Sequence, residues 1–388
     1  MLGLLAAVQF LGMAGWFAGG AVGAELAIRW ELSGSQVAWL ISAVQLGFVV
    51  GTLVAAVLNL PDIIPSRWYV AAAAAAAGLA NAGLLLAGGF GGALVTRFFL
   101  GFFLAGVYPP AMKMAATWFA SRRGVAIGVV VGALTVGKAL PYLVEALGGV
   151  GVEAVVRSTA GAALAAAALV AFGYRDGPHA FPRRPFSWRL VGEVVRTREL
   201  RLVTGGYLGH MWELYAFWGF IGAYWAATLA ARGGGTPPTV AWLTFASIGI
   251  GVVGCLWGGV AADRGGREPV VLISLMVSGA AAVASALVFG GPLPIVLTVI
   301  LIWGVAVIAD SAQFSALVTE LAPAHAVGTA LTLQTSAGFL LTMGAIQLVA
   351  AAGGPETGWA FPALSLGPVL GIASIAALQR IRRRPRTG

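Results

Sequence analysis

Five charged side chains lie deep inside long apolar stretches of this sequence. Arg97, Lys113 and Lys138 fall in the first half of the chain, and Glu213 and Asp310 fall in the second. A charge at the centre of a bilayer costs about 2.5 to 3.5 kcal/mol on insertion scales, so charges retained there indicate function. We predict that the five side chains contact a substrate or a coupling ion, with cations facing carboxylates across a central cavity.

Both carboxylates have polar neighbours at helical spacing. His210 precedes Glu213 by three residues and Gln313 follows Asp310 by three, so each pair shares one face of a helix. Glu213 and Asp310 are therefore candidates to carry a proton, with His210 or a cation of the first half tuning Glu213. Gln334 joins the candidate site because threonines share its helical turn.

The two cations of the predicted fourth helix cannot bind the same ligand atom. Arg97 and Lys113 are 16 residues apart, which is about 24 Å along a helix. Between them, Pro109 and Pro110 interrupt helix hydrogen bonds and predict a hinge. A snorkelling anchor is the alternative role for Lys113, and a structural tie to a carbonyl or polar side chain is the alternative for Arg97.

Lys113 and Asp310 have opposite charges and equivalent positions in the two halves of the chain. Lys113 follows Gly106, and Asp310 follows Gly304 at a similar interval. We predict that the two side chains form an ion pair that breaks when the protein opens on its cytoplasmic side. A static buried pair is the alternative.

The composition places these residues in membrane helices. Apolar residues make up 59% of the 388 residues and charged residues only 10%, against roughly 25% charged in soluble domains. A soluble enzyme and a disordered chain are excluded. We predict an all-α membrane protein with twelve transmembrane helices, since apolar runs near the spanning length of about 20 residues fall at 2–24, 36–58, 69–88, 92–118, 124–147, 155–174, 202–230, 239–261, 269–290, 293–318, 328–352 and 359–379.

The predicted helices divide into two bundles of six. Residues 1–174 form the first, residues 175–201 a basic cytoplasmic linker, and residues 202–388 the second with a basic tail. Arg29, Arg157 and Arg232 are the only loop cations on one side of the membrane. The other side holds 17, which are Arg67, Arg122, Arg123, Arg175, Arg183, Arg184, Arg189, Arg196, Arg198, Arg201, Arg264, Arg267, Arg380, Arg382, Arg383, Arg384 and Arg386. The positive-inside rule then places both termini in the cytoplasm.

One helix combines a packing face with a face for the cavity. Gly124, Gly128 and Gly132 repeat every four residues and form a flat stripe for close helix contact. Lys138 lies six residues beyond Gly132 and points about 240° away from the stripe. We therefore expect Lys138 to line the cavity between the bundles.

Two motifs resemble those of a known transporter family. Gly259 to Arg267 has the sequence G-V-A-A-D-R-G-G-R, which matches the G-x-x-x-D-R-x-G-R loop motif of the major facilitator superfamily. The equivalent loop of the first half keeps only Asp62 and Arg67. Arg97 with Gly101 is similar to the family's R-x-x-x-G segment, which is associated with substrate or proton coupling. With the six plus six helices, the resemblance covers essentially the whole chain.

The resemblance implies a cytoplasmic gate at this loop motif and at Asp62 and Arg67 of its first-half copy. Asp263 can accept from the N-terminal amides of a helix in the other bundle, while Arg264 and Arg267 pair with carboxylates. The alternative is that the two arginines serve only as anchors at the membrane surface.

The resemblance also implies a secondary transporter of the bacterial inner membrane that works by alternating access. No nucleotide-binding G-x-x-x-x-G-K-[ST] segment is present, and His179, His210 and His325 are too scattered to suggest a metal site. We predict no enzyme activity, catalytic residue, cofactor or metal. The expected partners are a small-molecule substrate, a coupling proton and the lipid bilayer, with no nucleic acid, and the protein is expected to be a monomer.

Three buried cations against two buried carboxylates favour a small anion, with proton or exchange coupling. The alternative is proton-coupled efflux of amphipathic organic cations, favoured by the two carboxylates and by the aromatic residues around Glu213. Such aromatic residues also serve in packing and interfacial belts. A membrane enzyme, a scaffold and a binding-only sensor are further alternatives.

Overall fold

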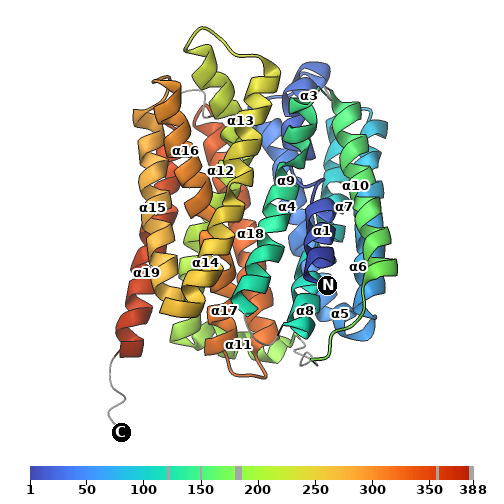
Figure 1. The fold of residues 1–388 in the computed structure, drawn as a ribbon, viewed down its shortest axis with the longest axis vertical. Helices are drawn as coiled ribbons and strands as arrows, with labels where there is room; N and C mark the ends of the chain where they lie inside the picture. Colours follow the sequence, from blue (N-terminus) through green and yellow to red (C-terminus); the bar gives the residue numbers. More distant parts are fainter. Residues whose placement is uncertain (120–122, 149–150, 180–185, 355–357, 384–388) are drawn as a thin grey trace.

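The computed structural model describes residues 1–119, 123–148, 151–179, 186–354 and 358–383. These residues form helices joined by short connections (Figure 1). The helices of the first half are α1 (Leu2–Gly12), α2 (Ala18–Ala21), α3 (Gly23–Trp30), α4 (Gly34–Val57), α5 (Leu60–Ile63), α6 (Ser66–Ala82), η1 (Gly83–Leu86), α7 (Phe90–Leu104), α8 (Tyr108–Trp118), α9 (Arg123–Ala146) and α10 (Val152–Gly173).

The second half begins with a short helix that lies across one end of the molecule (Figure 1). Its helices are α11 (Trp188–Arg196), α12 (Arg198–Ala230), α13 (Pro237–Gly249), α14 (Gly251–Gly265), α15 (Arg267–Leu287), α16 (Leu293–Ala309), α17 (Ser311–Leu321), α18 (Val327–Ala351), η3 (Phe361–Ser365) and α19 (Leu366–Arg383). We call the end that holds α5, α8, α11 and α17 the linker end, and the opposite end the α3 end.

Each of the twelve predicted spans coincides with a helix or with helices separated by a short break. Ten segments of the described chain are long and apolar enough to cross a membrane by length and composition. The first span contains only the shorter apolar helix Leu2–Gly12 before its break. The seventh is α12, whose 33 residues include Glu213 and His210.

Four spans that the sequence predicts as continuous are broken in the structure. The first span is interrupted at 13–17 and extends to Trp30, and the fourth is interrupted at 105–107. The eighth breaks at Ile250 and the tenth at Asp310. Only the fourth has the proline signal that the sequence analysis used, because α8 carries Pro109 and Pro110 in its first turn. Backbone N–H groups in the first turn of a helix have no acceptor within that helix, so the two prolines remove no helix hydrogen bond.

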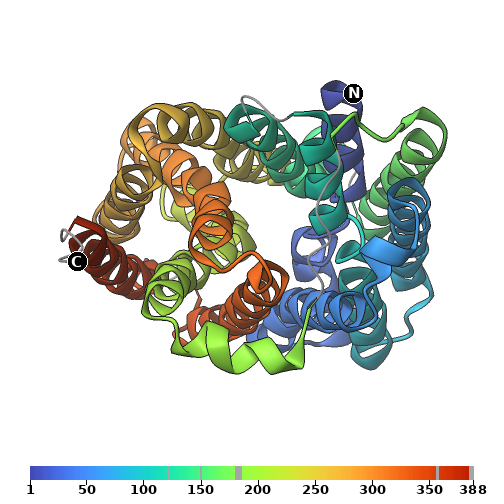
Figure 2. The same cartoon turned by 90° about the horizontal axis from the view of Figure 1, so that it is seen from below.

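The two halves meet mainly along three pairs of helices. In Figure 2 the earlier helices gather on one side and the later helices on the other. Between the halves, α4 packs against α18, and α9 packs against α13 and α14. Glycines allow the α9–α14 contact, since a Cβ at Gly128 would lie 2.8 Å from the carbonyl oxygen of Cys255 and one at Gly132 would lie 2.8 Å from Val252. The glycine stripe predicted on this helix therefore faces the other half.

Several of the loop cations that the sequence analysis places on the cytoplasmic side lie outside the described residues. They are Arg122, Arg183, Arg184, Arg384 and Arg386.

Candidate functional site

Lys138 lies between the halves, enclosed by aromatic rings. Its Nζ donates to the hydroxyl oxygen of Tyr215 at 2.6 Å. Nζ also lies 4.1 Å from the ring centroid of Trp16, 4.6 Å from that of Tyr215 and 5.1 Å from that of Trp218. Lys138 is buried, and no carboxylate of the described residues forms an ion pair with it. Cation–π contacts therefore replace the counter-charge that a buried ammonium ordinarily needs.

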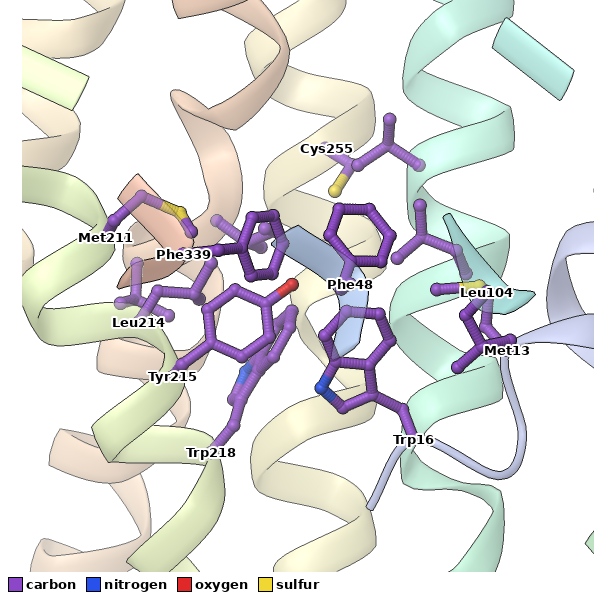
Figure 3. Close-up of a cluster of buried hydrophobic side chains, with 14 of the residues drawn as sticks. Met13, Trp16, Phe48, Leu104, Met211, Leu214, Tyr215, Trp218, Cys255 and Phe339 are labelled. Atoms are coloured by element: carbon purple, nitrogen blue, oxygen red, sulfur yellow. The ribbon is translucent and has the colours of Figure 1, made fainter. Parts of the chain in front are cut away.

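The rings around Lys138 belong to a larger aromatic cluster at the centre of the molecule. Trp16 contacts Phe48, Tyr215 and Phe339, with ring centroids 5.2, 5.6 and 5.7 Å apart. Phe48 and Phe339 are 4.5 Å apart, so rings from both halves interlock (Figure 3). Aromatic pairs at these separations contribute about 0.5 to 1.5 kcal/mol beyond their burial. The cluster therefore closes the middle of the molecule.

A small cavity adjoins the aromatic cluster. Its volume is about 30 Å³, which is room for one or two water molecules. The wall is formed by residues of α8, α9, α12, α16, α17 and α18, with Lys138 its single charged member. Both halves therefore contribute to the cavity.

Arg97 is bound to the break in the first span. Its Nη2 donates to the carbonyl oxygens of Gly15 at 3.0 Å and Trp16 at 2.5 Å, and Nη1 donates to Asn81 Oδ1 at 3.0 Å. Gly19 leaves space for it, because a Cβ there would lie 2.9 Å from Arg97 Nε. Carbonyls freed by the broken helix thus receive charged donors. This is the structural tie that the sequence analysis named as the alternative for Arg97.

His210 and Asp310 form a buried pair within the second half. His210 Nδ1 lies 2.8 Å from Asp310 Oδ1, and both side chains are 1% exposed. The contact is an ion pair when the imidazole is protonated, but it does not have the geometry of a hydrogen bond. Within the described structure, His210 Nε2 and both carboxylate oxygens of Asp310 have no hydrogen-bond partner. Three polar atoms are therefore available to a proton or a ligand.

Glu213 has different partners from those the helical spacing suggested. Its Oε1 accepts from Trp303 Nε1 at 2.6 Å and its Oε2 accepts from Ser278 Oγ at 2.8 Å. His210, one turn away, pairs with Asp310 instead. Glu213 therefore lies among α12, α15 and α16 and is not part of the cavity wall.

The predicted ion pair between Lys113 and Asp310 is not formed in this conformation. Lys113 Nζ donates to Asp62 Oδ1 at 2.5 Å and to the Pro61 carbonyl at 2.8 Å, whereas Asp310 contacts His210. The short helix α5, which the sequence analysis did not predict, brings Asp62 to Lys113. Each charge therefore has a partner in its own half.

The loop motif at the linker end joins the two halves. A Cβ at Gly124 would lie 2.4 Å from Asp263 Oδ1, so the Asp263 carboxylate touches the first turn of α9. Backbone N–H groups and the helix dipole favour a negative charge at this position. Arg264 is exposed in the last turn of α14.

Arg267 ties the motif to α17. Its Nε donates to Glu320 Oε1 at 2.6 Å and its Nη1 to Gln313 Oε1 at 2.9 Å. Gln313 in turn donates to the Gly258 carbonyl at 3.3 Å. The degenerate first-half copy differs, because Asp62 binds Lys113 and Arg67 lies over the adjacent ring of Trp68 at 4.8 Å.

A family comparison agrees with this architecture. The model described as Major Facilitator Superfamily matches residues 4–343. The chain belongs to the major facilitator superfamily. A solved structure described as a bacterial homologue of the human lysosomal transporter Spinster, in an inward-facing and occupied conformation, superposes with a TM-score of 0.70. It is 14% identical and covers 100% of this chain and 98% of its own, so the likeness concerns the fold. No curated protein matches the chain.

Sequence reasoning selected some residues of the candidate site and missed others. Lys138 and Asp310 were selected because each is a charge inside an apolar run. Trp16 and Trp303 were missed, since a tryptophan in a membrane helix gives no signal of whether it faces lipid, a ligand or a buried charge. Gln334 is buried on α18, where its Nε2 has no partner within the described residues. Within the described residues it forms no hydrogen bond with Glu213 or Asp310.

Proposed function

We propose that this secondary transporter moves a small anion by alternating access, with proton or exchange coupling. Lys138 carries the proposal because it is a buried cation between the halves with no carboxylate partner in the described structure. An anion bound there would supply the counter-charge and contact both halves at once. Binding would then favour the closed conformation over either open one.

We further propose that the proton is carried by the pair of His210 and Asp310. Both side chains are buried and each has an unpartnered polar atom. Glu213 is the weaker candidate because both of its oxygens already accept hydrogen bonds. Protonation would change the charge of the His210–Asp310 pair without changing which side chains line the cavity.

The proposed orientation places the linker end in the cytoplasm. The basic residues of the linker and the loop motif gather there, in agreement with the positive-inside rule. Residues 1–174 and 202–388 would be the moving halves, residues 175–201 the connection between them, and the bacterial inner membrane the location. Asp263 and Arg267 would then hold the cytoplasmic side closed.

Thermal stabilisation of the purified protein by ligands tests the anion proposal. A bound ligand stabilises by RT ln(1 + [L]/Kd), about 2.7 kcal/mol at 100 Kd. We expect anions to stabilise the unmodified protein and to lose this effect in Lys138→Met. Arg157→Met is the control, because it removes an exposed cation that pairs with Glu153.

Efflux of amphipathic cations is the second candidate, favoured by the aromatic cluster and the buried carboxylates. Stabilisation by lipophilic cations alone, lost in Asp310→Asn and retained in Lys138→Met, would replace the anion proposal with this one.

A further inference from the structure

The cavity offers one positive charge in an otherwise uncharged wall. Besides Lys138, its polar wall residues are Tyr108, Tyr207, Tyr215 and Ser311. A single negative charge would be neutralised here. A dianion would keep one charge uncompensated in a buried site, which costs several kcal/mol even after relaxation. The wall therefore matches a monoanion.

Unused hydrogen-bond donors surround the same ammonium. The indole Nε1 atoms of Trp16 and Trp218 are buried and have no hydrogen-bond partner within the described structure. Both rings are almost fully buried, at 1% and 0% exposed, and both face Lys138 Nζ. The Trp16 nitrogen points toward the side of the cluster that holds Tyr215 and Trp218 (Figure 3). Buried donors are ordinarily satisfied, so two orphaned N–H groups beside a cation indicate an absent acceptor.

Away from its hydroxyl groups, the wall and the adjoining cluster are apolar and aromatic. Phe48 and Phe339 make a tilted ring contact in the cluster, and Leu134, Met211 and Leu214 belong to the wall. An inorganic oxyanion presents acceptor oxygens on every side and would face these side chains without donors. A carboxylate presents acceptors at one end only. An apolar body attached to it would meet the rings of Phe48 and Phe339.

We propose that the substrate is an organic monocarboxylate with an apolar body. Its carboxylate would bind Lys138, the Tyr215 hydroxyl and the indole N–H groups of Trp16 and Trp218, while its body packs against Phe48 and Phe339. The inference rests on the proposed anion site and narrows the class of anion. Because the cavity holds only one or two waters, it must widen to admit the substrate.

Equilibrium binding to the purified full-length protein tests the class. The probes are phenylacetate, acetate, nitrate and phenethylamine, which vary the apolar body, the acceptor geometry and the sign of the charge. We expect phenylacetate to bind at least tenfold more tightly than acetate or nitrate, and phenethylamine not to bind. Nitrate binding as tightly as phenylacetate would overturn the monocarboxylate class and leave the anion proposal standing. Phenethylamine binding with no binding of any anion would overturn both.

Two conservative variants test the recognising groups. Tyr215→Phe removes only the hydroxyl, and Trp218→Phe keeps an aromatic ring but removes the indole N–H together with the pyrrole ring. Each should weaken phenylacetate binding about ten- to hundredfold. Phe217→Leu is a control, because Phe217 packs on Trp303 away from the cavity. Unchanged phenylacetate affinity in both variants would overturn the assigned contacts even if Lys138→Met fails to fold.

Discussion

Arg97 reaches the candidate site through the backbone of Trp16. It holds the carbonyls of Gly15 and Trp16 in the broken first span, and the Trp16 ring lies over Lys138. Arg97 is therefore a positioning residue in this structure. The R-x-x-x-G resemblance correctly drew attention to Arg97, but its neighbours are protein groups and not the cavity.

We predict that Arg97→Lys and Trp16→Phe have coupled effects on phenylacetate binding. A lysine keeps the charge but cannot span three acceptors in fixed geometry, and each buried carbonyl left unsatisfied costs about 1 to 3 kcal/mol. Once Trp16 is replaced, losing Arg97 should cost less binding affinity than it does in the unmodified protein. A double-mutant cycle measures this coupling. Additive losses of affinity would mean that Arg97 supports only the fold.

Also at the residue scale, we predict that Asp310→Asn abolishes proton-driven transport but leaves substrate exchange intact. The substitution keeps a side chain of the same size beside His210 but removes the carboxylate. In proteoliposomes, substrate exchange should continue, whereas uptake driven by a pH gradient should fall to the background rate. Glu213→Gln is the comparison, because Trp303 and Ser278 hold that carboxylate away from the cavity. Loss of gradient-driven uptake only in Glu213→Gln would show that Glu213, and not Asp310, carries the proton.

At the scale of helices, glycines determine which helices pack with their backbones in close contact. A Cβ at Gly258 would lie 2.1 Å from the Ala309 carbonyl oxygen, inside the second half. Gly258→Ala should therefore lower the free energy of unfolding by about 1 to 3 kcal/mol, since the backbones must separate. Gly161→Ala on α10 meets nothing within 4 Å and should be neutral or slightly stabilising. Thermal unfolding in detergent compares the two, and equal melting temperatures would contradict the close packing.

The helices also show how far sequence can predict this fold. Hydropathy located all twelve spans, and the loop motif located the contacts of Asp263 and Arg267. The breaks at 13–17 and at Asp310 were not predicted, because no proline marks them and distant groups such as Arg97 stabilise the first. The partner that Lys113 has in this conformation was not predicted for a similar reason. The symmetry of the two halves identified Asp310 as the counterpart of Lys113. The partner in the structure is Asp62, which is placed by α5, a one-turn helix with no periodic signal in the sequence.

At the scale of the whole molecule, α17 links the candidate proton site to the linker end. Asp310 precedes its first residue, and Gln313 and Glu320 on the same helix both bind Arg267. Gln313 and Glu320 lie three and ten residues beyond Asp310. A displacement of α17 at Asp310 would therefore move both partners of Arg267. The same motion would change the contact between α14 and α9, where the halves meet.

Cys255 reports on that contact because it is the only cysteine and is buried where α14 faces α9, with its Sγ 3.9 Å from Thr135 Oγ1. We predict that Asp263→Asn speeds alkylation of Cys255 by N-ethylmaleimide about two- to fivefold. A carboxylate at an exposed helix N-terminus contributes about 0.3 to 1 kcal/mol, which shifts a two-state equilibrium by that factor. Arg264→Gln, in the same exposed turn, should leave the rate unchanged. If both variants alkylate at the unmodified rate, Asp263 does not hold the halves together. If phenylacetate slows alkylation in Asp263→Asn, the conformation described here is the one that binds substrate, because a ligand shifts the population only toward the state it prefers.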